Sequence, residues 1–216
     1  MIDRAMTIID ITPSVSARTP MFPGDTIFSA TRSWEISGEC PVNVSEVVMS
    51  THTGAHADAP LHYDAKGKPI DQVDVSAYIG PCAVVHVIDG APTVTREVLS
   101  AALDNISAVA PERVLVRTYD RLPDLWDENF TAIGADAIDW LAEQGCRLIG
   151  VDTPSLDPAT SKSMDAHNAV NRADMRILEG LRLDDVAPGV YELIAPPLKL
   201  EGLDAAPVRA LLRTLP

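Results

Sequence analysis

The chain has 216 residues, of which 46% are hydrophobic and 22% charged, and its formal net charge at pH 7 is −14. This length and composition predict a single globular domain over residues 1–216. The negative charge disfavours binding to a nucleic-acid backbone or to an anionic membrane surface, because both are themselves negative. We therefore expect neither as a partner, and no apolar stretch is long enough to span a membrane.

The predicted elements alternate between strands and helices. Short apolar runs rich in β-branched residues indicate buried strands, whereas apolar residues spaced three or four apart indicate helices. In chain order, the elements are a strand at Ile8–Ile11, a partly alternating strand at Val42–Thr51, a strand at Ala83–Ile88, a helix N-capped by Thr95 that runs through Ile106, a strand at Arg113–Arg117, a helix at Ala135–Gln144, a strand at Leu148–Val151, a helix at Ala166–Leu178 and a strand at Tyr191–Ala195. Periodicity does not distinguish strand from helix at Val208–Leu212. This alternation predicts an α/β domain with a mixed sheet.

The N-terminal segment and the cysteines bear on cellular location. The apolar run of residues 1–10 is interrupted by Asp3 and Asp10, and no small-residue cleavage site follows it, so the segment does not resemble a signal peptide. The chain has three cysteines, Cys40, Cys82 and Cys146. Their odd number and wide spacing argue against a disulfide framework and against a thiolate metal site. Free thiols fit a reducing compartment, so we expect a cytoplasmic location.

Three of the five histidines lie within eleven positions. Residues 51–62 read Thr-His-Thr-Gly-Ala-His-Ala-Asp-Ala-Pro-Leu-His. Imidazole nitrogen and carboxylate oxygen are good ligands for first-row metals, which makes His52, His56 and Asp58 candidate ligands. Histidines four apart would share one face of a helix, but Gly54 and Pro60 disfavour a helix here. We therefore predict an ordered loop, in which the two oxygens of Asp58 could bridge two ions.

His62 follows six residues after His56 and has two candidate functional roles. It could be another metal ligand, or it could be a proton shuttle, because histidine titrates near neutral pH and suits general acid-base work. A solvated loop histidine is the structural alternative.

Two stretches far downstream contain further candidates. Asp152–Pro158 follows an apolar strand and is predicted to form a rigid turn, a common place for site residues in α/β folds. Ser155 lacks the G-x-S-x-G surroundings of a hydrolase nucleophile, so we do not assign it that role. His167 opens the next predicted helix beside Asp165, which could cap the helix or orient an imidazole. Glu179 lies at the predicted end of that helix, where a glutamate is usually solvated.

The remaining histidine and the tryptophans are interpreted as structural. His86 lies among valines in the predicted strand Ala83–Ile88 and is expected to be a structural histidine. The three tryptophans are expected to be packing groups rather than cofactor contacts: Trp34, Trp126 and Trp140.

Together, these segments resemble the cyclase-like family of metal-dependent amide hydrolases. The family signature H-x-G-T-H-x-D-x-P-x-H is matched from His52 to His62, with Ala55 in place of the usual threonine. Within the family the chain is most similar to the bacterial kynurenine formamidases. The supporting stretches are Phe22-Pro23-Gly24-Asp25, Leu115–Thr118, Gly150–Asp157, Met164–His167 and Ile177–Leu181. The resemblance extends from about Ile8 to Leu212.

The resemblance implies a homodimer with a swivelling β/β/α-like fold and two zinc ions per chain. In the positions of this sequence, it assigns one metal to His52, His56 and Asp58. It assigns the second metal to Asp58, His167 and Glu179, with Asp58 and Glu179 available as bridges. It makes His62 the proton donor and acceptor. Phe22, where most relatives have tryptophan, would contact the aromatic substrate.

The implied reaction is hydrolysis of N-formyl-L-kynurenine to L-kynurenine and formate, a step of tryptophan breakdown, by a hydroxide held at the dinuclear zinc centre. An alternative within the family is an isatin hydrolase that opens a cyclic amide, with manganese in place of zinc, because these ligand types do not separate the two metals. A non-catalytic metal-binding protein is a third hypothesis. His62 argues against it, because a structural site is closed by its ligands and needs no poised base.

Overall fold

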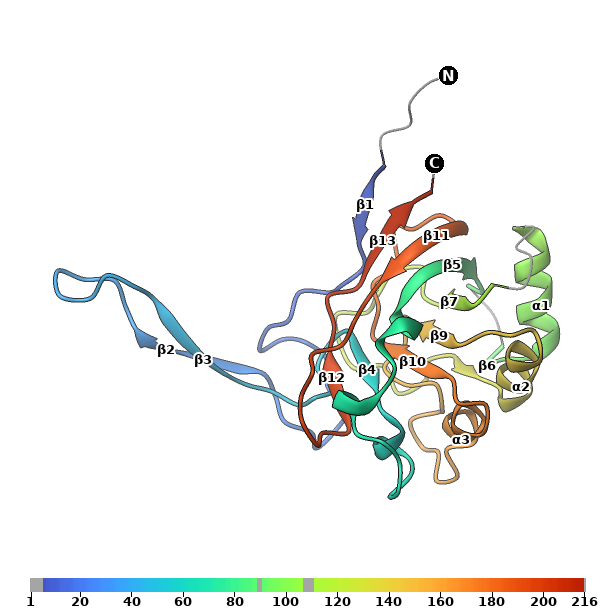
Figure 1. Ribbon diagram of the computed structural model, residues 1–216, viewed down its shortest axis with the longest axis horizontal. Helices are drawn as coiled ribbons and strands as arrows, with labels where there is room; N and C mark the ends of the chain where they lie inside the picture. Colours follow the sequence, from blue (N-terminus) through green and yellow to red (C-terminus); the bar gives the residue numbers. More distant parts are fainter. Residues whose placement is uncertain (1–5, 89–90, 107–110, 216) are drawn as a thin grey trace.

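The computed structural model describes residues 6–88, 91–106 and 111–215, so residues 1–5 of the N-terminal segment discussed above lie outside the described residues. Within the described ranges, nine strands form one large mixed sheet, in the order β1-β13-β11-β5-β7-β9-β10-β4-β12 (Figure 1). In that order, the strands are Ile8–Asp10, Leu211–Thr214, Gly189–Ile194, Ile79–His86, Arg113–Arg117, Leu148–Val151, Arg176–Glu179, His56–Asp58 and Ala205–Pro207. The central strands β5, β7, β9 and β10 are parallel to one another, and the outer pairs are antiparallel.

Helices cover one side of the sheet (Figure 1). They are α1 (Arg96–Asn105), α2 (Ala135–Glu143) and α3 (Asp165–Arg172). Alternate residues of the parallel strands, such as Val85 and Val116, point to this side and form one core with the helices. The residues between them, such as Val84 and Leu115, point to the other face and belong to a second core, which the curled sheet encloses. Burial of both faces explains why these strands are almost continuous apolar runs in the sequence.

The remaining regular elements are short. The strands β2 (Ser29–Trp34) and β3 (Val44–Val48) form one separate pair, and β6 (Thr93–Val94) and β8 (Ala132–Ile133) form another. Three short 3-10 turns span Pro60–His62, Ile70–Gln72 and Val75–Tyr78. No helix in the described part of the chain is long and apolar enough to cross a membrane.

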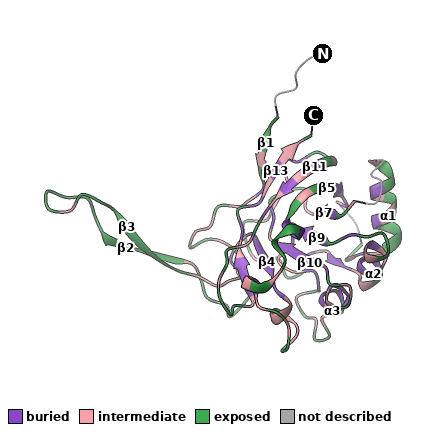
Figure 2. Ribbon diagram, in the orientation of Figure 1, coloured by how far each residue is buried: buried purple, intermediate pink, exposed green. Residues whose placement is uncertain are grey.

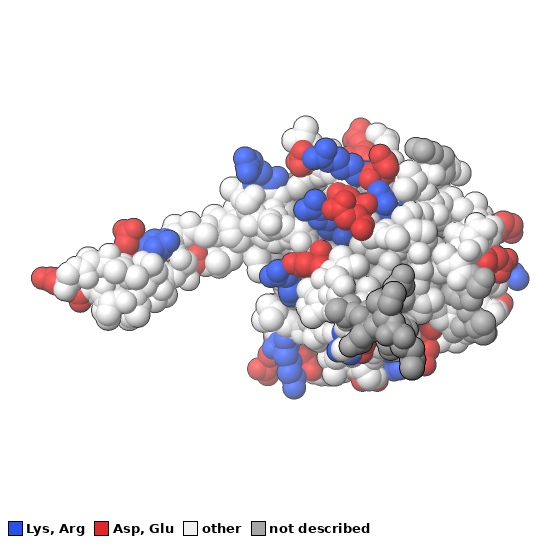
Figure 3. All heavy atoms as spheres, turned by 90° about the horizontal axis from the view of Figure 1, so that it is seen from above, with Lys and Arg blue, Asp and Glu red and all other residues white. Residues whose placement is uncertain are grey.

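The hairpin of β2 and β3, residues 29–48, projects far from the body of the molecule, and we call it the arm (Figure 1). Every residue of both strands is exposed, as the green colour of the arm in Figure 2 shows. Six large apolar side chains on the arm are between 41% and 61% exposed: Trp34, Ile36, Val42, Val44, Val47 and Val48. Figure 3 shows charged side chains at several points of the arm, with uncharged surface between them. The arm therefore presents apolar surface that its own chain does not cover.

The predicted α/β domain with a mixed sheet is confirmed, and several elements lie where the sequence placed them. Strands β7 and β9 have the predicted bounds, and β1, β5 and β11 overlap their predictions. Helix α1 begins directly after Thr95 as expected, although the Thr95 side chain makes no capping hydrogen bond. The segment Val208–Leu212, which could have been strand or helix, enters strand β13 at Leu211.

The predicted helix at Ala166–Leu178 is wrong in its second half. Helix α3 ends at Arg172, and Arg176–Glu179 is the strand β10. Asp174 has a φ of 51°, in the left-handed region, which ends the helix. The apolar residues that follow pair in parallel with β9 instead of continuing the helical turn.

The predicted loop at residues 51–62 is also wrong in part, because His56–Asp58 is the strand β4. It lies between β10 and β12 in the sheet. The alanines at positions 55, 57 and 59 are buried in the second core, so the alternation of small apolar and polar residues is that of a strand.

Candidate metal centre

The sheet brings His56, Asp58 and Glu179 together. His56 and Asp58 are two apart on β4, so their side chains share one face of the strand. Strand β10 runs antiparallel to β4, and its last residue, Glu179, is directly opposite His56. The glutamate is therefore 3% exposed at a strand end, and the expectation of a solvated helix end is wrong. His167 reaches the same place from the first turn of α3, and His52 reaches it from the loop before β4.

Asp58 is at the centre of this cluster, and its two oxygens face different histidines. Its Oδ1 lies 3.2 Å from the Nδ1 of His52 and 3.5 Å from the Nε2 of His56. Its Oδ2 lies 3.5 Å from the Nε2 of His167. Glu179 has the same two-sided arrangement, with Oε2 at 3.3 Å from His56 Nε2 and Oε1 at 3.5 Å from His167 Nε2. Asp58 and Glu179 thus both lie between His56 and His167.

Several of these atoms are buried without a hydrogen-bond partner. They are His56 Nε2, His167 Nε2 and both carboxylate oxygens of Asp58. Leaving such atoms buried and unpaired is costly, so their convergence needs an explanation. Ligands at 2.0–2.2 Å from a tetrahedral ion lie roughly 3.3–3.6 Å from one another. The donor types and the separations around Asp58 therefore fit metal ions.

In His52, His56 and His167, the ring nitrogen that points away from Asp58 lies close to an oxygen atom. His56 Nδ1 lies 2.8 Å from the carbonyl oxygen of Gly54, and His167 Nδ1 lies 2.6 Å from Asp157. His52 Nε2 lies 2.9 Å from Asp204. Histidines that bind metals almost always donate their second ring N–H to a carboxylate or a carbonyl in this way. The arrangement directs the free nitrogen of each ring toward Asp58.

The orienting group for His167 is Asp157, and not Asp165 as one of the sequence interpretations had it. Asp157 also accepts hydrogen bonds from the backbone amides of Ala166 and His167, at 3.0 and 3.1 Å. The N-cap position belongs to Met164, and Asp165 is the first residue of α3. The sequence places Asp157 in the turn after a core strand, but only the folded turn shows which imidazole it faces.

The carboxylates and imidazoles of the cluster stabilise each other's charged forms. Burial alone would raise the pKa of Asp58, but the neighbouring imidazoles of His167 and His52 outweigh it and hold that pKa well below its usual value. Burial disfavours the cationic forms of His52 and His167, yet the neighbouring carboxylates raise their pKa values to about 9 and about 10. Glu179 and Asp58 raise the pKa of His56 in the same way. Because ligands must be deprotonated to bind, protons compete with metal ions at this site.

His62 lies at the exposed edge of the cluster. It ends the 3-10 turn after β4, and its side chain is 31% exposed. Its ring centre is 4.3 Å from that of His52, and its Nε2 is 4.0 Å from Asp58 Oδ2. Its Nδ1 lies 3.4 Å from Asp204, a residue that the sequence analysis missed. Nothing near Asp204 in the sequence indicates the contact, because the pairing of β12 with β4 creates it.

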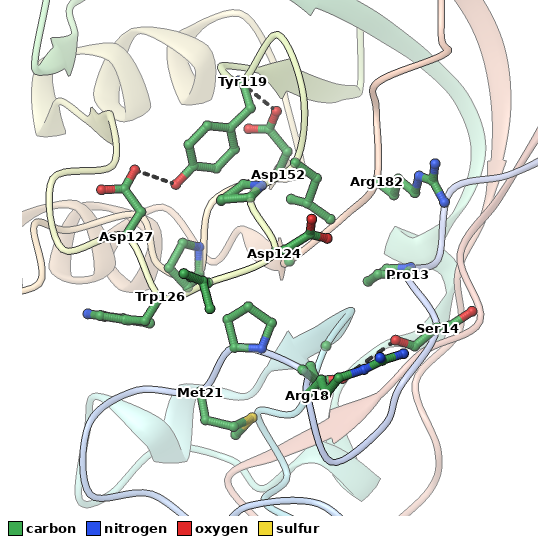
Figure 4. A pocket seen from close by; sticks show the side chains of 18 of the residues that line it. Pro13, Ser14, Arg18, Met21, Tyr119, Asp124, Trp126, Asp127, Asp152 and Arg182 are labelled. Atoms are coloured by element: carbon green, nitrogen blue, oxygen red, sulfur yellow. Dashed lines mark hydrogen bonds between the residues drawn. The ribbon is translucent and has the colours of Figure 1, made fainter.

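A cavity of about 920 Å³ reaches the cluster at His52 and His56. Figure 4 shows Tyr119, Trp126 and Asp127 on one side of the cavity and Pro13, Ser14, Arg18 and Met21 on the other. Phe22 also lines it and meets Trp126 edge to face, with ring centres 5.3 Å apart. The cavity is thus large enough for a small aromatic molecule whose far end would approach the histidines.

The sequence predicts structural roles for the three tryptophans and for His86. Trp140 packs against the helix-side core as predicted, whereas Trp34 is 60% exposed on the arm and Trp126 lines the cavity. His86 is structural as predicted, because its Nε2 lies 2.8 Å from the carbonyl oxygen of Val186. The three cysteines are free thiols.

The chain matches a known protein family and several solved structures. Residues 9–158 match the family model Cyclase, described as “Putative cyclase”. Two solved structures are 28% identical to the chain. One is a potential metal-dependent hydrolase with cyclase activity, with a TM-score of 0.83 over 98% of this chain and 100% of that one. The other is a predicted metal-dependent hydrolase from Bacillus stearothermophilus, with a TM-score of 0.81 over the same shares.

An isatin hydrolase bound to the product analogue thioisatinate has the same fold. It is 23% identical to this chain, with a TM-score of 0.81 over 98% of this chain and 93% of that one. The family match covers the segment that carries His52, His56, Asp58 and His62, and the structural matches extend it through β10 and β12. The chain belongs to the Cyclase family.

Proposed function

We propose that the chain is a metal-dependent hydrolase that cleaves N-formyl-L-kynurenine to L-kynurenine and formate. The observation that carries the proposal is the cavity with aromatic walls that ends at a cluster of buried, unpaired ligand atoms. The two structures at 28% identity, one named as a potential and the other as a predicted metal-dependent hydrolase, support the reaction class. The aromatic substrate comes from the resemblance to kynurenine formamidases and fits the Phe22–Trp126 wall.

The ligand atoms divide into two sets that share Asp58. We propose that His52, His56 and Asp58 Oδ1 hold one ion and that Asp58 Oδ2, His167 and Glu179 hold the second. Asp58 supports this division, because its Oδ1 faces His52 and His56 whereas its Oδ2 faces His167. Zinc is the proposed metal, and manganese remains the alternative, because imidazole and carboxylate ligands suit both.

The reaction breaks the bond between the formyl carbon and the aryl nitrogen. The water oxygen bonds to the carbon, and the nitrogen leaves as an amine after it gains a proton. Bound metal ions supply a water of lowered pKa and polarise the carbonyl oxygen. The chain's own contribution is to position the groups. Phe22 and Trp126 hold the aryl ring, and His62 carries the proton to the leaving nitrogen.

We propose a homodimer in which a second copy of the chain covers the arm. A two-stranded hairpin is only marginally stable alone in water, and every residue in both strands of this one is exposed. Its six half-exposed apolar side chains offer on the order of several hundred Å² of apolar surface, a large part of the roughly 800 Å² per partner in a standard interface. A single domain over residues 1–216 and a cytoplasmic location stay predictions.

The dimer is tested by light scattering coupled to size-exclusion chromatography. We expect a dimer for the native chain and a monomer for the double variant Trp34→Ser, Ile36→Ser. The control is Val190→Ser, which removes a side chain that is 46% exposed on the body and should leave the dimer intact. A monomeric native chain, or dissociation by the control alone, would contradict the proposal.

The reaction is tested by measuring metal content and hydrolysis of formylkynurenine and isatin in the same preparation. We expect two ions per chain and turnover of formylkynurenine. Turnover of isatin without turnover of formylkynurenine would replace this proposal with the cyclic-amide alternative. Bound metal with no hydrolysis of either substrate would favour a non-catalytic metal-binding protein.

A further inference from the structure

We infer that Asp204 is a positioning residue that fixes the orientation and the tautomer of two histidines at once, His52 and His62. The effect on His62 rests on the proposed function, because only that function makes His62 a proton shuttle. The effect on His52 depends only on metal binding. Asp204 lies outside both proposed ligand sets.

One carboxylate oxygen makes both contacts. Asp204 Oδ2 lies 2.9 Å from the Nε2 of His52 and 3.4 Å from the Nδ1 of His62. The other oxygen, Oδ1, accepts a hydrogen bond of 3.1 Å from the hydroxyl of Thr51. This third contact orients the carboxylate plane so that Oδ2 faces the two rings.

The backbone of Asp204 is tied to the same strand as the ligands. Its carbonyl oxygen accepts a 2.8 Å hydrogen bond from the amide of Ala59, directly after β4. The next residue, Ala205, is opposite Asp58 in the pairing of β12 with β4. Asp204 therefore has a fixed position relative to Asp58, as a group that positions other side chains requires.

The chemistry of the carboxylate decides where the histidine protons are. An ionised carboxylate only accepts hydrogen bonds, so a ring nitrogen that faces it carries the proton. For neutral His52, this leaves the lone pair on Nδ1, which lies 3.2 Å from Asp58 Oδ1. For neutral His62, it leaves the lone pair on Nε2, which lies 4.0 Å from Asp58 Oδ2. Both free nitrogens then point toward the proposed metal centre, one as a ligand and one as a base.

The test replaces Asp204 by asparagine, which keeps the shape but can present an amide N–H in place of an acceptor. The matched control is Asp71→Asn. Asp71 accepts a hydrogen bond of 2.9 Å from Gly202, in the segment that leads to Asp204. Asp71→Asn removes a carboxylate that contacts residue 202, and Asp204→Asn removes one that belongs to the same segment, but only the Asp204 carboxylate contacts histidines.

Two measurements need no substrate. We expect Asp204→Asn to weaken metal affinity about 10- to 100-fold in a chelator competition, the usual cost of losing a carboxylate partner of a ligating histidine. In the metal-loaded protein, where a ligating His52 is neutral, we also expect the ¹⁵N shifts of the His52 and His62 rings to show loss of the single native tautomer. Asp71→Asn should leave both unchanged. Native affinity and native tautomers in Asp204→Asn would overturn the inference, whatever the enzyme hydrolyses.

The third measurement is a double-variant comparison at saturating metal. If Asp204 acts through His62, Asp204→Asn should lower kcat with KM nearly unchanged, and should cost nothing further in a chain that already carries His62→Ala. Losses in kcat that multiply would refute the link to His62. Loss of one whole ion per chain from Asp204→Asn would make Asp204 a ligand instead and would also overturn the inference.

Discussion

Replacing Gly180 by alanine should weaken both the fold and the candidate metal centre. Gly180 has a φ of 64°, and a Cβ added there would lie 2.4 Å from the carbonyl oxygen of Gly54. That oxygen is the partner of His56 Nδ1. The left-handed conformation costs an alanine about 1–2 kcal/mol. Displacing the packed backbone costs a further ~1–3 kcal/mol. We therefore expect the free energy of unfolding to fall by about 2–5 kcal/mol.

The control is Gly145→Ala, far from the centre in the turn after α2. Gly145 has a φ of 86°, but nothing lies within 4 Å of a Cβ built there. This variant should lose only the conformational part, about 1–2 kcal/mol. Thermal unfolding measures the difference, because each kcal/mol shifts the Tm of a protein of this size by about 2–4 °C. A chelator competition should show weaker metal binding for Gly180→Ala alone. Equal losses of stability in the two variants, with metal affinity unchanged, would refute the steric reasoning.

Three further predictions concern single side chains. His62→Ala should keep its metal and lose about 10²- to 10⁴-fold in rate, whereas His56→Ala should lose metal as well; equal metal loss would make His62 a ligand. Phe22→Ala should raise KM for formylkynurenine about 2- to 10-fold with little change in kcat, the equivalent of about 0.5–1.5 kcal/mol of ring contact, and an unchanged KM would exclude Phe22 from the substrate site. Burial raises the pKa of Asp152 to about 6 despite hydrogen bonds from Thr118 and Tyr119, so the folded state holds this proton more tightly than the unfolded state does. The stability that the proton confers is therefore present below pH 4 and is lost as the pH rises through 6. Relative to Asp152→Asn, the native protein should lose about 3 kcal/mol between pH 4 and pH 7, measured by denaturant unfolding, and parallel stability curves for the two proteins would contradict it.

The sequence predicts best the elements whose signal is local. Strands β7 and β9 are buried on both faces, so their apolar runs identify them without any knowledge of the sheet. Strand β10 has the same kind of run but follows a helix with only a short turn between them, and its apolar residues were read as a continuation of that helix. The turn depends on Asp174 adopting a left-handed conformation, which the local sequence does not require.

The residues of the candidate site also differ in how far the sequence alone predicts them. His52, His56, Asp58 and His62 are close in sequence, so their spacing alone predicts a cluster, and the resemblance adds His167 and Glu179. The sequence cannot show that Glu179 is opposite His56, because that contact depends on the register of β10 against β4. Asp204 is still less accessible to sequence reasoning, because it is 152 residues from the histidine that it contacts.

That separation has a consequence for how the protein acquires its metal. The segment that carries His52 is synthesised long before Asp204, and the two meet only when β12 has paired with β4. Contacts between such distant segments form late, since the entropy of closing the intervening loop opposes them. A chain with an open sheet therefore presents His52 without its Asp204 partner, and it should hold metal more weakly than the folded chain does. Tight metal binding should therefore follow closure of the sheet. An ion that binds the folded chain selectively stabilises it against unfolding by mass action.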